Sequence, residues 1–391
     1  MRANRTIYGA AVALAVAAVG SLCGPPAKAD PPPTPRFQVD PFWPKPLPHN
    51  WVTGEVGGTC VDSQDHVFIV TRGFQTGGLV SPEGVAGRPE KSTASPPAIE
   101  FDPAGNVVNS WGNPSLEPAG DPNAGKNAVL PHGIHGCFVD FEDNVWIAGN
   151  GDGVVQKYSH DGSTLLLQIG TKFLCDNGTP SGGACGNVGL EGFSKTLLND
   201  PADIAVDPTN GDVYIADGYG NHRVVVFDKN GTYLRQMGGV GTGLGQFTAG
   251  DGGHPHCVVL GKDGLVYACD RGNDRINVYR KDGTPVKEIP VIPGTAALGT
   301  AGSAWDVDFS PGNQQTFMYE SDGGNEVVWI FNHAAALAGL PSALLYGFGR
   351  PGHGVGEFTF LHMMAVDSHG NLYAGETIGG RRIQKFKPKD D

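Results

Sequence analysis

The chain has 391 residues, including 60 glycines and 30 prolines; 39% of its residues are hydrophobic and 17% are charged. This composition indicates a folded, turn-rich and mainly β chain, because enough apolar side chains remain to bury a large core. The formal net charge of −13, with no basic run, excludes nucleic acid as a working hypothesis and disfavours an anionic membrane surface.

The first 29 residues have the features of a secretory signal peptide. Arg2 and Arg5 precede an apolar run, and a small-x-small cleavage pattern ends at Ala29. A membrane anchor is less well supported, because the run is short and rich in Ala and Gly; no other stretch is apolar enough to span a bilayer. We therefore expect a secreted or periplasmic protein in which residues 30–391 form a single domain.

Six cysteines remain in that domain, and an oxidising compartment permits disulfides. Cys175 and Cys185 flank a glycine-rich loop and could close it. The other four lie in strand-like stretches, where we expect buried free thiols, and the sequence defines no pairing for them.

One pattern recurs six times: an apolar strand ending in Asp, a tight turn, and a strand of alternating aromatic and aliphatic residues. The copies begin at Cys60, Phe138, Ala205, Val258, Val307 and Ala365. The residues that end the first strand of each copy, here called anchors, are Asp62, Asp140, Asp207, Gly261, Ser310 and Asp367.

Each copy supplies three or four short strands joined by turns that favour hairpins. A single such sheet has two faces to cover, and radial packing of several sheets buries both faces. The repeats therefore predict an all-β fold, a six-bladed β-propeller. Longer gaps predict loops at residues 73–97 and 171–199, and a short helix is expected near residues 334–345.

The strand that ends at each anchor is expected to be the innermost strand of its blade, so that its residues line a central channel. Five residues before the anchors stand Gly57, His135, Ala202, His256, Trp305 and His362. Histidine thus occupies alternate blades, about 120° apart in a six-fold ring, and the three imidazoles should converge at one depth. Neutral imidazoles bind Zn²⁺ well, and three protein ligands leave a fourth position open, as in catalytic sites.

Two further histidines lie close to this set in the sequence. His132 and His254 could replace a ligand or act as hydrogen-bond partners of the ligands. In the segment LPHGIHG, the spacing of five favours His135 over His132.

The segments PHGIHG, PHC and LHM resemble the zinc-ligand segments of an NHL-repeat propeller family, the peptidyl-α-hydroxyglycine α-amidating lyases, across nearly all of residues 30–391. The resemblance implies a six-bladed propeller whose catalytic Zn²⁺ is held by three histidines. It assigns the catalytic tyrosine to Tyr219 in ADGYGNHR. It assigns two arginines to Arg271 in CDRGNDR and Arg72 in TRG.

Two positions depart from the family pattern. Met363 stands where the family has an aspartate that helps bind calcium, so the resemblance does not extend to that calcium site. Gly220 stands where the family has a cysteine, so the corresponding disulfide is missing.

The chemistry implied is cleavage of an N-acyl α-hydroxyglycine or related carbinolamide to an amide plus glyoxylate or an aldehyde. Zinc in the open site would lower the pKa of the substrate hydroxyl. Tyr219 would act as the base, and Arg72 and Arg271 would favour its phenolate or hold a substrate carboxylate.

Two other classes stay open at this point. One is a non-catalytic propeller that binds a protein or ligand, because fold does not determine function. The other is a metal-dependent hydrolase, a lactonase or esterase. Such propellers use carboxylate and Asn ligands suited to calcium, and the channel positions counted here offer no Glu. The sequence leaves the acyl group, the native metal and the oligomeric state undefined, since imidazoles also bind other transition metals.

Overall fold

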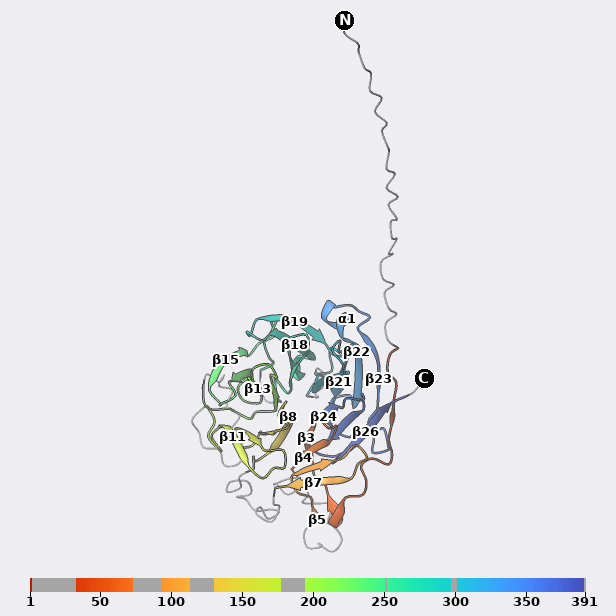
Figure 1. Cartoon of the computed structure of the whole chain (residues 1–391). Coiled ribbons are helices and arrows are strands. Elements are labelled where there is room, and N and C mark those ends of the chain that lie inside the picture. The colour runs from red at the N-terminus through yellow and green to blue at the C-terminus, as the bar shows by residue number, and fades with distance from the viewer. Residues whose placement is uncertain are drawn as a thin grey trace. The chain divides into compact units, whose positions relative to one another are not determined.

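The computed structural model describes Met1 and residues 33–72, 93–112, 130–176, 194–249, 252–296 and 301–389. The predicted signal peptide and much of both predicted long loops lie outside these residues. Residues from Pro35 onward form one compact unit, in which six four-stranded antiparallel sheets surround a centre (Figure 1). The predicted six-bladed β-propeller is confirmed. Among the described residues, no helix has the length and apolarity to cross a membrane.

The blades follow one another along the chain, and each begins with its innermost strand. Blade 1 contains β3 (Val56–Val61), β4 (Val67–Thr71), β6 (Ala98–Phe101) and β7 (Val107–Trp111). Blade 2 contains β8 (Ile134–Val139), β9 (Val145–Gly149), β10 (Val154–Tyr158) and β11 (Leu165–Gly170). Blade 3 contains β12 (Asp203–Val206), β13 (Val213–Asp217), β14 (Arg223–Phe227) and β15 (Tyr233–Gly238).

The second half of the ring repeats this arrangement. Blade 4 contains β16 (Val258–Leu260), β17 (Leu265–Asp270), β18 (Arg275–Arg280) and β19 (Pro285–Pro290). Blade 5 contains β20 (Asp306–Phe309), β21 (Phe317–Asp322), β22 (Val327–Asn332) and β23 (Leu344–Phe348). Blade 6 contains β24 (Leu361–Val366), β25 (Leu372–Glu376), β26 (Arg382–Pro388) and β1 (Phe37–Val39).

The outermost strand of blade 6 comes from the opposite end of the unit. β1 pairs antiparallel with β26, with Phe37 opposite Pro388 and Val39 opposite Phe386. The repeat pattern did not predict this closure, because β1 lies before the first repeat. Pairing the two ends of the propeller covers an edge that would otherwise be exposed.

A small sheet and a short helix lie outside the four-stranded sheets. β2 (Trp51–Val52) and β5 (Thr93–Ala94) form a two-stranded parallel sheet beside blade 1. The predicted helix is present as α1 (His333–Ala338), capped by Asn332, but it is shorter than expected. Gly339 ends it with a φ of 70°, and part of the predicted helical segment forms β23 instead.

The anchor residues close the turns that follow the innermost strands. Oδ1 of Asp62 accepts the backbone N–H groups of Gln64 and His66, and Asp140 and Asp367 accept the equivalent pair in their own turns. An Asp side chain that bonds to its own turn competes with continuation of the strand. This explains why the strand stops at the anchor.

Adjacent blades share apolar layers that form the core. One layer joins Tyr214 and Ala216 of blade 3 to Val258 and Val266 of blade 4, all of them buried. Removal of both sheet faces from water is the main driving force for this packing.

The expectation of four buried free thiols was wrong. Cys60 and Cys137 form a disulfide between blades 1 and 2, and Cys257 and Cys269 form another within blade 4. The innermost strands of neighbouring blades lie side by side, which brings the Cα atoms of the first pair to 5.8 Å, within disulfide range. Cys175 is also disulfide-bonded, and Cys185 lies outside the described residues.

Candidate metal centre

The structure brings together the three histidines that sequence spacing selects. His135 lies in β8, His362 lies in β24, and His256 precedes β16 by two residues. Their ring centroids are 4.7–4.9 Å apart in all three pairs. Each offers a ring nitrogen, and these three nitrogens lie within 4.8 Å of one another. We call these residues the triad.

The other ring nitrogen of each triad residue bonds to the next blade. The partners are the backbone carbonyls of the residues that stand five before the anchors in the three blades without a triad histidine. They are Ala202 for His135 (2.8 Å), Trp305 for His256 (2.7 Å) and Gly57 for His362 (2.9 Å). A carbonyl can only accept, so Nδ1 must be the protonated nitrogen in each ring. The lone pair of each Nε2 is therefore available, which is the usual arrangement of metal-binding histidines.

The surroundings keep the triad uncharged. Burial lowers the pKa of each of the three imidazoles well below 6.5, and the positive charges of nearby groups, including Arg271, lower it further. Nε2 of His256 is buried and, within the described residues, has no hydrogen-bond partner. A buried polar atom without a partner is costly, and a metal ion would satisfy it. The donor set therefore fits a zinc ion with one open position.

Tyr219 and Arg271 border the triad. The Tyr219 hydroxyl lies 3.2 Å from Nε2 of His135, and Nη2 of Arg271 donates to the same hydroxyl at 3.3 Å. Arg271 also donates to the carbonyl of Gly252, and its guanidinium lies 4.2 Å from the ring centroid of Trp305. Stacking on Trp305 holds the cation against the tyrosine oxygen.

Matching ion pairs fix the loops that carry these two residues. In blade 3, Asp217 pairs with Arg223 at 2.9 Å, and Tyr219 lies between them in the chain. In blade 4, Asp270 pairs with Arg275 at 3.0 Å, and Arg271 lies between them. Both aspartates are fully buried, so their pairing with Arg closes each loop in a defined shape.

Arg72 follows β4 and is bonded to other protein groups. Its Nε donates to the carbonyl of Ile134 at 2.7 Å, and its Nη1 pairs with Glu55 at 3.0 Å. Its charge nevertheless contributes to the low pKa values of His135 and His362, so it lies within electrostatic reach of the triad.

The two alternative histidines do not belong to the triad cluster. His132 lies in the segment before β8, where its backbone N–H donates to Asp152 and its ring faces Phe173. Nδ1 of His254 accepts the N–H of Gly272 at 3.2 Å, which fixes the backbone next to Arg271. Burial lowers the pKa of His254 to about 3.

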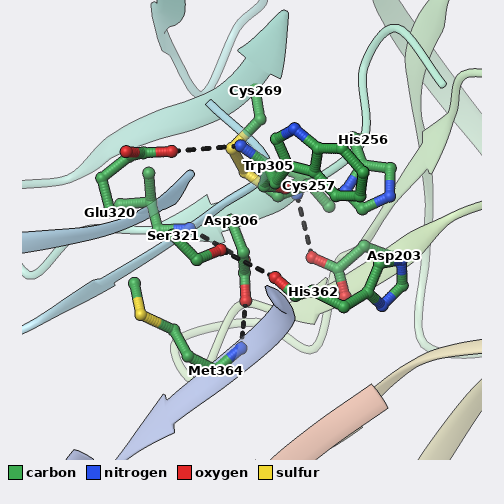
Figure 2. Close-up of a disulfide and its surroundings, with 12 residues drawn as sticks. Asp203, His256, Cys257, Cys269, Trp305, Asp306, Glu320, Ser321, His362 and Met364 are labelled. Atoms are coloured by element: carbon green, nitrogen blue, oxygen red, sulfur yellow. Dashed lines mark hydrogen bonds between the residues drawn. A yellow bond between two sulfur atoms is a disulfide. The ribbon is translucent and has the colours of Figure 1, made fainter. Parts of the chain in front are cut away.

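Two residues of this region, Glu320 and Ser321, were not assigned a role from sequence. Figure 2 shows Glu320 next to Trp305, whose backbone N–H it accepts at 3.1 Å, and Ser321 donating to the carbonyl of His362 at 2.7 Å. Burial raises the pKa of Glu320 well above its usual range, which favours the protonated carboxyl. A signal existed for Glu320 and Ser321: polar side chains follow one another in a strand where the pattern calls for buried apolar residues.

Six blades and a channel with three converging imidazoles define a β-propeller with a candidate metal centre. Residues 198–227 match the NHL repeat. NHL repeat-containing protein 3 of Homo sapiens is 30% identical over 278 residues, which cover 66% of this chain and 67% of that protein. The Mus musculus protein is 28% identical over 373 residues, covering 90% and 85% of the two chains. The chain belongs to the family of NHL repeat-containing proteins.

Two further relatives carry names that refer to amidation. Peptidyl-glycine alpha-amidating monooxygenase A of Xenopus laevis is 27% identical over 269 residues, covering 65% of this chain and 24% of that protein. The "Probable peptidyl-alpha-hydroxyglycine alpha-amidating lyase" of Caenorhabditis elegans is 24% identical over 146 residues, covering 37% of this chain and 36% of that one. The similarity thus spans about a quarter and about a third of these two relatives.

Proposed function

We propose that the protein is a zinc-dependent lyase that cleaves the C–N bond of N-acyl α-hydroxyglycine-type carbinolamides, releasing an amide and glyoxylate or an aldehyde. One observation carries the proposal: three buried, neutral imidazoles converge beside the hydroxyl of Tyr219. The similarity to proteins named for amidation and for an amidating lyase supports the same reaction class.

His135, His256 and His362 would hold the zinc ion through Nε2. When bound there, zinc would polarise the substrate hydroxyl and lower its pKa. The hydrogen bonds from Nδ1 to Ala202, Trp305 and Gly57 keep the three rings oriented before any ion binds.

Tyr219 is assigned the proton transfer. Its phenolate, which the hydrogen bond from Arg271 stabilises, takes the proton of the substrate hydroxyl. The carbon–oxygen double bond forms as the C–N bond breaks, and the electron pair of that bond goes to nitrogen. The nitrogen then takes the proton from Tyr219. The products are an amide and glyoxylate, no water is consumed, and Tyr219 returns to its starting state.

Arg72 and Arg271 are assigned the substrate carboxylate. Both present planar guanidinium groups near the triad, and such groups bind carboxylates through two parallel hydrogen bonds. Binding to Arg72 would compete with Glu55, its present partner.

The test is product analysis with an N-benzoyl α-hydroxyglycine and zinc-loaded protein in ¹⁸O-labelled water. We expect equal amounts of benzamide and glyoxylate, with no label in the benzamide. A hydrolase would instead release labelled benzoic acid. Zinc-loaded protein that releases no glyoxylate would overturn the proposal.

We also propose that this reaction takes place in the periplasm or outside the cell, after removal of residues 1–29. Amino-terminal sequencing of the protein recovered from its compartment should begin at Asp30. Recovery of an uncleaved chain from the cytoplasm would contradict this location.

A further inference from the structure

A second cluster of ligand-type side chains lies at the far end of blade 1. Asp62 directly follows β3, His66 lies in the turn before β4, and Glu100 lies in β6. His160 reaches the cluster from the turn between β10 and β11 of blade 2. Gly57, whose carbonyl bonds to His362, lies near the start of β3, and Asp62 follows the end of that strand. The length of the strand therefore separates this cluster from the triad by roughly 15 Å.

Asp62, His66 and Glu100 each offer one ligand atom, and these three atoms lie within 4.8 Å of one another; His160 adjoins this group through Asp62. Nδ1 of His66 is 2.6 Å from Oε1 of Glu100 and 3.9 Å from Oδ2 of Asp62. Nε2 of His160 is 2.9 Å from the same Oδ2. Ligands on a tetrahedral zinc ion with bonds of about 2.0 Å are about 3.3 Å apart, so the present separations lie on both sides of that value.

The two carboxylates of the cluster have histidines as their ionic partners among the described residues. The side chain of Asp62 is 0% exposed and that of Glu100 is 5% exposed. Among the described residues, neither carboxylate forms an ion pair with a lysine or arginine, and their ionic partners are His66 and His160. With neutral imidazoles the site would hold two buried negative charges, which is costly.

The hydrogen bonds of Asp62 leave one of its carboxylate oxygens facing the histidines of the cluster. Oδ1 of Asp62 is used by the turn, where it accepts two backbone N–H groups, and Oδ2 points to both histidines. Nδ1 of His66 faces two carboxylates, but a single N–H can bond strongly to only one of them. A metal ion would bind both carboxylates and His66 at once, and His160 lies beside the same Asp62 oxygen as the fourth ligand.

We propose that Asp62, His66, Glu100 and His160 form a zinc site that is separate from the triad. Four protein ligands complete a tetrahedron, which is the pattern of a structural site. The ligands come from blades 1 and 2, which the Cys60–Cys137 disulfide also joins. The side chains of His66 and His160 are 23% and 34% exposed, which gives an ion access from solvent. The bound ion stabilises the contact between these two blades.

The test counts zinc ions per chain by mass spectrometry after the metal-free protein is dialysed against Zn²⁺. We expect two ions in the wild type, one in His66→Ala, one in His256→Ala and none in the double variant. The matched control is His353→Ala, an exposed histidine on the connection between β23 and β24. We expect it to retain both ions.

A second variant guards against misfolding. Glu100→Gln keeps the shape and the hydrogen bond to His66 but removes the charge, so we expect its zinc affinity at this site to fall at least tenfold. Chelation should lower Tm in His256→Ala but not in the double variant Glu100→Gln, His256→Ala. Loss of an ion in His353→Ala, or no change in zinc content in His66→Ala, would overturn the proposal.

The two sites are tested independently. If His256→Ala keeps every ion and His66→Ala loses one, the second site stands and the proposed lyase centre fails. If His256→Ala loses the only ion present in the wild type, the second site fails and the triad stands.

Discussion

The two halves of the central channel carry titratable groups of opposite kinds. One half holds the triad, and the other is a cavity of about 140 Å³ lined by Asp203, Asp306 and Asp308. Burial raises the pKa of Asp203 and Asp308 to about 7 and that of Asp306 well above its usual value. The same burial lowers the pKa of the triad. The directions differ because an imidazole becomes neutral by losing a proton and a carboxyl becomes neutral by gaining one.

The halves also differ in how their polar atoms are satisfied. The carboxyls of Asp203, Asp306 and Asp308 each accept a backbone N–H from the next blade, at 2.7–3.0 Å. The triad gives its N–H groups to the next blade, and Nε2 of His256 has no hydrogen-bond partner among the residues that the structure describes. Burial alone therefore does not distinguish the two halves. What sets the triad apart, under the proposed function, is that three ring nitrogens converge beside the hydroxyl of Tyr219.

The largest effect that would test this contrast is expected from His256→Ala. The substitution removes one of three ligands, so we expect loss of the triad zinc and a fall in glyoxylate release of at least about 10²-fold. Metal content and turnover should be measured together. His353→Ala, an exposed histidine on the β23–β24 connection, is the control. Unchanged activity in His256→Ala would place the triad with the structural half of the channel.

Tyr219→Phe should have the next largest effect. The ring stays in place but the proton acceptor is removed, so we expect kcat to fall roughly 10²- to 10³-fold while zinc content stays at the wild-type value. Steady-state kinetics would measure this, with Tyr233→Phe as the matched control. Full activity in Tyr219→Phe would require another base.

A smaller effect is expected from Arg271→Lys. Lysine keeps the charge but lacks the planar group that reaches both Tyr219 and Trp305. Loss of one charge-assisted hydrogen bond corresponds to a fall in kcat/KM of about tenfold. A value equal to wild type would show that only the charge of Arg271 matters.

The last prediction concerns the carboxyl half and a change in stability, with no effect expected on catalysis. The pKa of Asp308 rises from 3.8 to about 7 on folding, so the folded state binds the extra proton and stability falls as pH rises from about 4 to 7. The contribution lost is at most about 4 kcal/mol. In Asp308→Asn, Tm should therefore fall less between pH 5 and pH 8 than in the wild type. Thermal unfolding of the metal-free proteins at both pH values measures this.

An equal fall in Tm between pH 5 and pH 8 in the two proteins would contradict the assignment of Asp308 as a protonated, buried group. The absolute Tm of Asp308→Asn is less informative. The Asn amide cannot accept both N–H groups that the carboxyl accepts, from Phe309 and Val366, so the variant loses about 1 kcal/mol at any pH.

The repeat made much of this molecule predictable. Each blade begins with the same strand and turn, so the anchors set the register, and the register placed His135, His256 and His362 at one depth. Tyr219 and Arg271 were assigned through the family resemblance, and the ion pairs of Asp217 and Asp270 that hold their loops came from the structure. The preference for His135 over His132 came from the same count, and the geometry agrees with it.

By itself, the sequence determined the number of blades and the histidines that face the axis, because both follow from a period that is local to each repeat. Only the tertiary structure decided the closure by β1, the pairing of Cys60 with Cys137, and the contact of His160 with Asp62. These contacts join residues 77 or more positions apart in the chain. Whether they form depends on how neighbouring blades are rotated and packed against each other, and no pattern within a single repeat encodes that rotation.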